Sequence, residues 1–371
     1  MLERGPAARS DTTMNDNHSF EIVRTLGVGG MATVYLARRD EGGTSRHVAV
    51  KKAHAFLAED PASVAVLEDE AQLGACIRHP NVVRVIDFVA GSKQGEAPAL
   101  VMEWIEGVDL GKLVRAAAAA GRRLPIDVVA AIARDLLAGL HAAHETRRED
   151  GLALEIVHRD VSPQNVLVGF DGVVRITDFG VAKAAWRQQH TEQGSIKGKL
   201  GYLAPEQLSG RCDRRSDVFS AGVVVWELLT GTRMRAGDGV EMLVEILCSH
   251  TMAPSATAPG AACLDAVVMR ALAHSADDRV ATALEMLEAL ERQVTAASPA
   301  RVAEIVREIL SGAEPATVET VAQGEETVCE VIVVPAAPVV ARRPSRIESR
   351  CRAGWKNPRA RPRSESTRHA A

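Results

Sequence analysis

The chain has 371 residues, of which 46% are hydrophobic and 25% charged, so it can bury the core of one large domain or two ordinary ones. A formal net charge of −4 is too close to balance to indicate a protein that binds nucleic acid through its overall charge. Six scattered cysteines without a Cys-x-x-Cys pair argue against a zinc site or a disulfide framework, and the absence of a signal peptide or a membrane-length apolar run predicts a cytoplasmic protein with no membrane span.

The first predicted elements are two strands on either side of a glycine-rich turn. Residues 1–19 are polar, and we expect them to be disordered. Residues 20–26 and 33–37 are predicted to be strands. The turn between them consists of Gly27, Val28, Gly29, Gly30, Met31 and Ala32. Glycines let backbone N–H groups approach phosphate oxygens, although an ordinary hairpin explains such a turn about as well.

A third predicted strand, residues 48–51, ends in Lys51. A lysine in this position is usually just solvated, so any functional role depends on its partner. Asp60 and Pro61 then provide an N-cap and a proline for the first position of a helix. That helix carries three consecutive acids, Glu68, Asp69 and Glu70.

Two more strands and a long helix precede the most informative stretch of the chain. Residues 82–89 and 99–102 are predicted to be strands. Between Pro125 and His144 the apolar residues recur with helical spacing over about a third of the circumference, which predicts a helix packed on a core. This helix leads the chain to His158.

The most informative stretch runs from His158 to Asn165 and continues to Asp178. Apolar runs at 166–168 and 173–176 flank Phe170-Asp171-Gly172, a pattern that predicts a β-hairpin. Asn165 enters this hairpin and Asp178 leaves it, so both side chains lie at the same end. An amide and a carboxylate there can share a metal ion that also binds phosphates, because Mg²⁺ takes oxygen ligands.

These residues resemble the catalytic and metal-binding loops of the eukaryotic-type protein kinases. The segment from His158 to Asn165 reads His-Arg-Asp-Val-Ser-Pro-Gln-Asn, and residues 178–180 read Asp-Phe-Gly at the expected interval. The resemblance covers residues 20–293 and is greatest to bacterial serine/threonine kinases with a Gly-Gly-Met-Ala loop. It implies an α+β, two-lobed fold with a mainly β small lobe carrying one helix, and a mainly helical large lobe. It also implies transfer of the γ-phosphoryl group of ATP to protein hydroxyls.

The resemblance assigns roles to the residues of the cleft. Asp160 accepts or orients the proton of the substrate hydroxyl, while Asn165 and Asp178 hold Mg²⁺, with Mn²⁺ as an alternative. Lys51 contacts the nucleotide phosphates and pairs with Glu70, for which Glu68 is the rival. The other expected nucleotide contacts are the loop Gly27, Val28, Gly29, Gly30, Met31 and Ala32, the apolar Val34 and Ala49, the gatekeeper Met102, the backbone of Glu103 and Ile105, and Asp109 at the ribose.

The chain departs from the kinase pattern at three positions. Ala32 replaces the third glycine of the loop, which makes the phosphate geometry there less certain. Ser162 stands where serine/threonine kinases usually carry a lysine, and Lys199 stands where they carry a threonine. We hypothesise that these two residues have exchanged roles, so that Lys199 supplies the ammonium group. The rival interpretation is that Ser162 marks a weakened enzyme.

By the same resemblance, residues 184–199 form an activation segment in which Thr191 or Ser195 is phosphorylated by the protein itself, with Arg159 pairing with the phosphate. Asp217 is expected to hold the backbone of the catalytic loop, and Arg279 to pair with Glu206 of Ala-Pro-Glu. The expected partners are ATP, protein substrates including the chain itself, and a second copy in a homodimer, but no specific nucleic acid.

The C-terminal part is expected to contain a short amphipathic helix within residues 294–312, which either packs on the large lobe or meets a partner. Residues 313–371 are expected to be a disordered tail, with ten Lys or Arg residues between 342 and 368. Three other functions stay open: a pseudokinase scaffold, a small-molecule phosphotransferase and a tyrosine-directed kinase.

Overall fold

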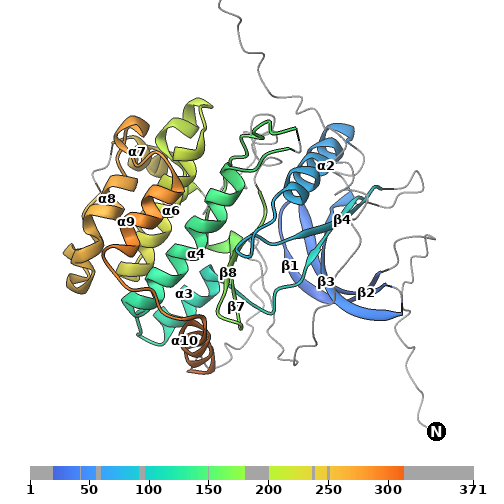
Figure 1. Ribbon diagram of the computed structural model, residues 1–371, viewed down its shortest axis with the longest axis horizontal. Coiled ribbons are helices and arrows are strands. Elements are labelled where there is room, and N and C mark those ends of the chain that lie inside the picture. Colours follow the sequence, from blue (N-terminus) through green and yellow to red (C-terminus); the bar gives the residue numbers. More distant parts are fainter. Residues whose placement is uncertain are drawn as a thin grey trace, which may run out of the picture.

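The computed structural model describes residues 20–41, 43–55, 60–91, 97–148, 150–179, 200–235, 239–248 and 251–312. The described chain forms two lobes (Figure 1). The small lobe is a β-sheet with the helix α2 (Pro61–Cys76), and the large lobe is mainly helical. The predicted two-lobed α+β architecture is therefore confirmed.

The sheet of the small lobe contains five antiparallel strands in the order β1-β2-β3-β5-β4. Their bounds are β1 (Phe20–Val28), β2 (Ala32–Glu41), β3 (Thr44–Ala53), β4 (Val85–Val89) and β5 (Ala99–Glu103). Apolar side chains such as Ala71 and Ala75 of α2 pack with Leu100 and Val85 of the sheet, which buries one face of each element.

The strand predicted over residues 82–89 is shorter in the structure, because its first residues pair with the large lobe. The N–H group of Val83 donates to Ile176 O (2.9 Å), and the side chain of Asn81 donates to Val174 O (2.8 Å). Backbone groups that bond across the lobes cannot also join the small sheet, so β4 begins only at Val85. This segment links the two lobes.

The large lobe is built around α4 and α6. Almost every residue of α6 from Ser216 onward is buried, as its nearly continuous apolar sequence predicted. Contacts of α4 with α6 and α9 form the centre of the core. The helices of this lobe are α3 (Leu110–Ala119), α4 (Ile126–His144), α6 (Arg214–Thr230), α7 (Gly239–Cys248), α8 (Asp265–Ala271), α9 (Ala283–Glu291) and α10 (Pro299–Gly312).

A three-stranded antiparallel sheet lies where the lobes meet, in the order β6-β7-β8. Its strands are β6 (Gly107–Asp109), β7 (Val166–Gly169) and β8 (Val174–Ile176). Gly172 turns the predicted hairpin in the left-handed region, with φ of 78°. Thr177 N–H donates to Asn165 O (3.0 Å), so the two ends of the hairpin lie together as expected.

Helix α10 packs on the large lobe, which decides between the two expectations for it. Val302, Ile305, Val306 and Ile309 are buried in the large-lobe core. Arg307 Nη2 donates to Phe170 O (2.7 Å) at the turn between β7 and β8, next to which α10 is drawn in Figure 1. The predicted domain boundary at residues 293–294 remains a prediction, although α10 shares the core of the kinase lobe.

No helix within the described parts of the chain is long and apolar enough to cross a membrane. Among the cysteines that the structure describes, Cys212, Cys248 and Cys263 are free and Cys76 is disulfide-bonded. The stretches predicted to be disordered, 1–19 and 313–371, lie outside the described residues.

Candidate active site

Asp217, which is 1% exposed, fixes the backbone of the catalytic loop. Its carboxylate accepts hydrogen bonds from the backbone N–H groups of His158 (2.7 Å) and Arg159 (2.8 Å), and His144 Nε2 lies 2.8 Å from Oδ2. Arg159 takes a φ of 67°, a conformation that is costly unless neighbours impose it. The expected role of Asp217 in holding this loop is confirmed.

Asp160 and Asn165 are oriented by each other. Asn165 Nδ2 donates both to Asp160 O (2.7 Å) and to Asp160 Oδ2 (2.8 Å). The ring of His158 supports the same segment, because Nδ1 accepts from Asp160 N–H (3.3 Å) and Nε2 lies 3.0 Å from Thr177 O. Since both amide hydrogens of Asn165 are used, its oxygen Oδ1 is turned away from Asp160 and is the atom that a cation would meet.

Lys51 joins the small lobe to Asp178, the predicted metal ligand. Its Nζ lies 2.8 Å from Glu70 Oε1 and 2.8 Å from Asp178 Oδ1. Burial opposes the charge of Lys51, but the carboxylates of Asp178 and Glu70 outweigh it and raise its pKa, so the ammonium group stays charged. Glu68 instead accepts a hydrogen bond from Gln72 (3.1 Å), so the structure pairs Lys51 with Glu70, as expected.

The donor set at this end of the cleft fits a divalent cation bound together with phosphates. Asn165 contributes an amide oxygen and Asp178 a carboxylate. The backbone of Asp178 has a φ of 59°, a left-handed conformation that a residue other than glycine keeps only where its surroundings impose it. No cluster of three or more His, Cys, Asp or Glu side chains that could hold a metal alone occurs in the portions of the chain that the structure describes. Mg²⁺ commonly binds in this manner, through one or two protein ligands and the phosphates of its substrate.

The glycine-rich loop closes as a tight turn between β1 and β2. Gly29 N–H donates to Ala32 O (2.9 Å), and His54 N–H donates to Met31 O (3.0 Å) from beyond the end of β3. Ala32, which replaces the family's third glycine, is 8% exposed and is the first residue of β2. Its side chain is therefore packed into the lobe. Gly27 and Val28 are the last residues of β1 and pair with Val34 and Thr33 of β2, whereas Gly30 lies in the turn.

An apolar cluster lies between the sheet and the connection to the large lobe. It joins Ala49 and Met102, which are register partners on β3 and β5, to Val34 and Ile105. Two further members, Leu26 and Leu167, were missed by the sequence reasoning. Leu167 follows Asn165 by two residues on β7 and is only partly buried between buried neighbours, a difference that the uniformly apolar sequence of this strand does not show.

Two polar residues of the expected nucleotide site already have partners in the protein. The N–H group of Glu103 donates to Arg84 O (2.9 Å), which leaves its carbonyl as the group for an adenine base. Asp109 caps α3 by accepting from Lys112 N–H (2.9 Å). Its predicted contact with a ribose is not tested by these contacts and stays a prediction.

Ser162 is 1% exposed, and its Oγ has no hydrogen-bond partner among the residues that the structure covers. A buried hydroxyl without a partner costs free energy, so the site is suited to receive a polar group. Lys199, its proposed exchange partner, lies outside the described residues, as do Thr191 and Ser195.

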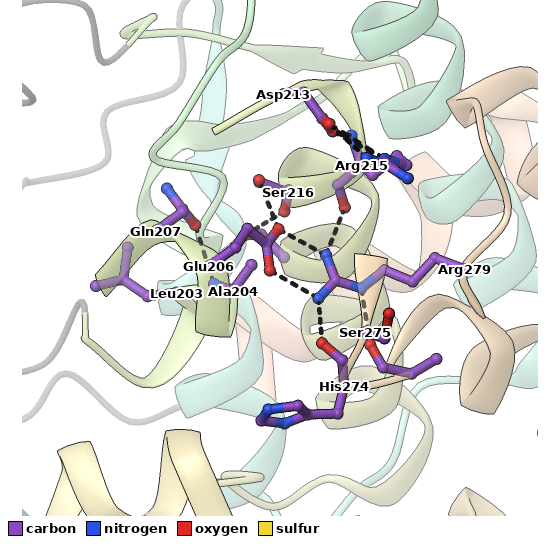
Figure 2. Close-up of polar contacts among 12 residues, drawn as sticks. Leu203, Ala204, Glu206, Gln207, Asp213, Arg215, Ser216, His274, Ser275 and Arg279 are labelled. Atoms are coloured by element: carbon purple, nitrogen blue, oxygen red, sulfur yellow. Dashed lines mark hydrogen bonds and ion pairs between the residues drawn. The ribbon is translucent and has the colours of Figure 1, made fainter. Parts of the chain in front are cut away.

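Behind the catalytic loop, the Ala-Pro-Glu segment is clamped by Arg279 (Figure 2). The guanidinium group binds both carboxylate oxygens of Glu206, at 2.7 and 2.8 Å, and its remaining N–H groups reach Ala273 O, His274 O and Arg215 O. All five donors of Arg279 are thus used. The predicted pairing of Glu206 with Arg279 is confirmed.

Gln207 ties this segment to the catalytic loop, a role that sequence reasoning missed. Its Oε1 accepts from Ala204 N–H (2.9 Å), and its Nε2 donates to Arg159 O (3.2 Å). A glutamine next to Ala-Pro-Glu carries no signal of its own in the sequence, because its partners are backbone groups.

The fold and site define a class: a two-lobed phosphotransferase whose cleft combines a charged lysine, a buried aspartate and an oxygen donor set for a divalent cation. A comparison with family models gives the same answer, since the protein kinase domain matches residues 20–263. The chain belongs to the protein kinase family, whose members use ATP and a divalent metal.

Curated relatives and solved structures support this membership. The chain is 36% identical over 277 residues to the tyrosine-protein kinase MasK of Myxococcus xanthus and 36% identical over 279 residues to the serine/threonine-protein kinase PknB of Mycobacterium tuberculosis. These matches cover 73% and 74% of the chain but only 42% of either relative. The crystal structure of the Mycobacterium tuberculosis PknI kinase domain matches with a TM-score of 0.57 and 26% identity, over 78% of this chain and 100% of that one.

Proposed function

We propose that the protein is a serine/threonine kinase that transfers the γ-phosphoryl group of ATP to protein hydroxyls, its own included, with Mg²⁺ or Mn²⁺ as the metal. The observation that carries this proposal is the orientation of Asp160 by Asn165, at 2.8 Å, in the same cleft as the Lys51–Asp178 pair. All four groups that a pseudokinase scaffold would usually lose are present, with Lys51 in contact with Asp178 and Asn165 in contact with Asp160.

In this mechanism the protein mainly positions and neutralises charge. Asp160 accepts the proton of the substrate hydroxyl, and Asn165 keeps its carboxylate aimed. Lys51, held by Glu70, binds the nucleotide phosphates. Asn165 and Asp178 would hold a divalent metal ion, which would supply positive charge to offset the negative charge of the transferred group. Leu26, Val34, Ala49, Met102 and Leu167 enclose the base.

The main experiment is a radiolabelled ATP assay on generic protein substrates, comparing the full chain with Asp160→Asn. We expect this variant to lose about 10²–10⁴-fold in phosphoryl transfer, because the proton acceptor is removed. Asp150→Asn, at a side chain 52% exposed, serves as control and should keep normal activity. Equal transfer by the wild type and Asp160→Asn would refute the proposed role, and transfer only to small molecules would favour a small-molecule phosphotransferase.

The phosphate acceptors are expected to include Thr191 or Ser195 of the activation segment. A phosphate there would carry nearly two negative charges and could pair with Arg159, whose buried Nε makes no hydrogen bond to the residues that the structure describes. Mass spectrometry of the product from the main experiment checks this proposal. An active preparation with both hydroxyls unmodified would contradict it.

A tyrosine-directed kinase is the second candidate, favoured by the absence of lysine at Ser162. One relative of the chain bears the name of a tyrosine-protein kinase. Phosphoamino-acid analysis of the radiolabelled product separates the candidates: phosphoserine or phosphothreonine supports our proposal, and phosphotyrosine alone supports the alternative. The cytoplasmic location and the homodimer remain part of the proposal.

The proposed exchange between Ser162 and Lys199 predicts that Lys199→Ala keeps ATP binding but loses about 10²–10³-fold in transfer, as when one stabilising donor is removed. The buried Oγ of Ser162 supports the exchange, since it makes no hydrogen bond to the residues that the structure describes and could accept one from an ammonium group. Lys197→Ala, two residues away, is the matched control. Near-normal turnover of Lys199→Ala would reject the exchange and favour the rival interpretation.

A further inference from the structure

Helix α10 holds the turn of the β7–β8 hairpin, at the opposite end of the hairpin from Asn165 and Asp178. Arg307 Nη2 donates to Phe170 O (2.7 Å) in this turn. The first residue of the helix lies against the same turn, since a Cβ atom on Gly172 would overlap the carbonyl oxygen of Pro299. Two separate points of α10 therefore contact one short turn.

Phe170 joins α10 to the connection between the lobes. Its carbonyl oxygen accepts from Arg307, and its N–H group donates to Glu106 O (2.8 Å). Glu106 directly follows Ile105, a member of the apolar cluster that we propose encloses the base. A displacement of the turn would therefore reach this cluster through two hydrogen bonds.

Strand β6, which continues the connection, is packed tightly on β7. Gly107 lies opposite Gly169, and a Cβ atom on Gly107 would overlap Val168 O. Further along the same pair of strands, Asp109 lies opposite Leu167 of the apolar cluster. Because closely packed elements transmit a displacement, the position of the turn sets the positions of Asp109 and Leu167.

Helix α10 is itself fixed to the large lobe. The segment before it is bonded to the start of α4, where Ala297 N–H donates to Asp127 O (2.9 Å). The helix also packs on α3, which begins directly after β6. One of its faces is buried in the large-lobe core through Val302, Ile305, Val306 and Ile309. A helix anchored in this way can hold the turn in place.

We propose that α10 positions the nucleotide site, with Gly172 and Arg307 as positioning residues that act through Phe170. This inference rests on the proposed function, because it concerns the affinity of the same cleft for Mg-ATP. Both residues act on the walls of the site and not on the proton acceptor Asp160. Changing them should therefore raise the KM for ATP and leave kcat nearly unchanged.

Gly172→Ala in the full chain tests the contact with Pro299. We expect the KM for ATP, and the Kd of a fluorescent ATP analogue measured with Mg²⁺, to rise about tenfold, with kcat changed less than about twofold. Gly151→Ala is the matched control, since Gly151 has a φ of 81° against 78° for Gly172 but nothing within 4 Å of its added Cβ. It carries the same backbone strain without the collision and should keep the wild-type Kd. A Gly172→Ala protein that is less stable but keeps the wild-type Kd would show that α10 is only structural, and would overturn the inference.

Arg307→Ala is a milder test that leaves the buried face of α10 intact. It should raise the KM for ATP about two- to fivefold, as expected for one lost hydrogen bond at the surface. Arg301→Ala is its control, because Arg301 is also exposed on α10 and its guanidinium pairs with Glu304 of the same helix (2.8 Å). Equal KM values in these two variants would refute the role of Arg307.

Hydrogen–deuterium exchange provides a readout that does not depend on turnover. Residues 105–109 should exchange several-fold faster in Gly172→Ala than in Gly151→Ala, while residues 216–229 of α6 serve as the internal reference. Equal exchange over 105–109 would contradict the coupling through Phe170. A wild type that binds no Mg-ATP would refute the proposed function, and this inference with it. Normal binding by the wild type, Gly172→Ala and Arg307→Ala alike would refute the inference alone.

Discussion

The ion pair of Arg279 in the large lobe and the ion pairs of Lys51 in the cleft have similar lengths but different surroundings. Arg279 and Glu206 are 2.7 and 2.8 Å apart at two atom pairs, and Lys51 lies 2.8 Å from both Glu70 and Asp178. Every other donor of Arg279 ends on a backbone carbonyl. We call the Arg279–Glu206 pair the closed pair, because every donor of Arg279 already has a partner in the protein and none remains to bind a ligand.

We call the ion pairs of Lys51 with Glu70 and Asp178 the open pair, because one of the two carboxylates is partly exposed in the cleft. One of its carboxylates, Asp178, is also the expected metal ligand, and its side chain is 24% exposed, against 6% for Glu70. A nucleotide with its metal would compete with Lys51 for Asp178, whereas Glu70 would keep hold of the lysine. The comparison teaches that every donor of the large-lobe pair has a partner within the protein, whereas the pair in the cleft includes a carboxylate that is partly exposed.

The largest expected effect follows from breaking the closed pair. Arg279→Met should lower the free energy of unfolding by about 3–5 kcal/mol, because Glu206 and several carbonyl groups lose a buried partner. Chemical denaturation measures this loss. The matched control is Arg215→Met, whose partners Asp213 and Asp277 are 52% and 88% exposed and whose ion pairs are worth roughly 1 kcal/mol or less. Similar losses in the two variants would contradict the contrast.

Breaking the open pair should cost activity more than stability. Lys51→Met is expected to reduce kcat by about 10²–10³-fold, since it removes the ammonium group that we propose orients the phosphates. Lys52→Met is the control, because neighbouring residues of a strand point to opposite faces. Initial rates and denaturation curves are measured for both variants. A Lys51→Met protein with normal kcat, or one as destabilised as Arg279→Met, would remove the distinction between the two pairs.

The sequence predicted the elements that carry these pairs, because their residues are bounded by clear signals. The hairpin around Gly172, the buried α6 and the choice of Glu70 over Glu68 all appear in the structure. In each case the pattern is local or is fixed by a motif of known spacing.

The contacts that the sequence could not reveal are made by residues without a local signal. Leu26 and Leu167 belong to the apolar cluster between the small-lobe sheet and the connection to the large lobe. A leucine in a strand has the same appearance in a sequence whether its side chain faces a cleft or a core. Gln207 acts through backbone groups. The shorter β4 arises because Val83 bonds to the other lobe, a tertiary contact that overrides strand propensity.

The smallest expected effect is a pH dependence of the free energy of unfolding that arises from Glu206 in the closed pair. Burial favours the neutral form of Glu206, but hydrogen bonds from Arg279 and Ser216 outweigh it and hold the pKa of Glu206 below its ordinary value of 4.5. The charged carboxylate therefore contributes stability that is fully present above the unfolded pKa and is lost as the pH falls through the lower folded pKa. Within that window the stability should fall by at most about 1.4 kcal/mol per pH unit from this group.

Glu206→Gln isolates this contribution, because glutamine does not titrate. The difference in free energy of unfolding between the wild type and Glu206→Gln should be constant well above the ordinary pKa of 4.5 and shrink as the pH falls through the lower folded pKa. Urea denaturation at several pH values measures it, and subtracting the variant removes the effects of the other carboxylates. A difference that stays constant over this range would mean that Glu206 has the same pKa in both states, and that Arg279 does not hold its charge.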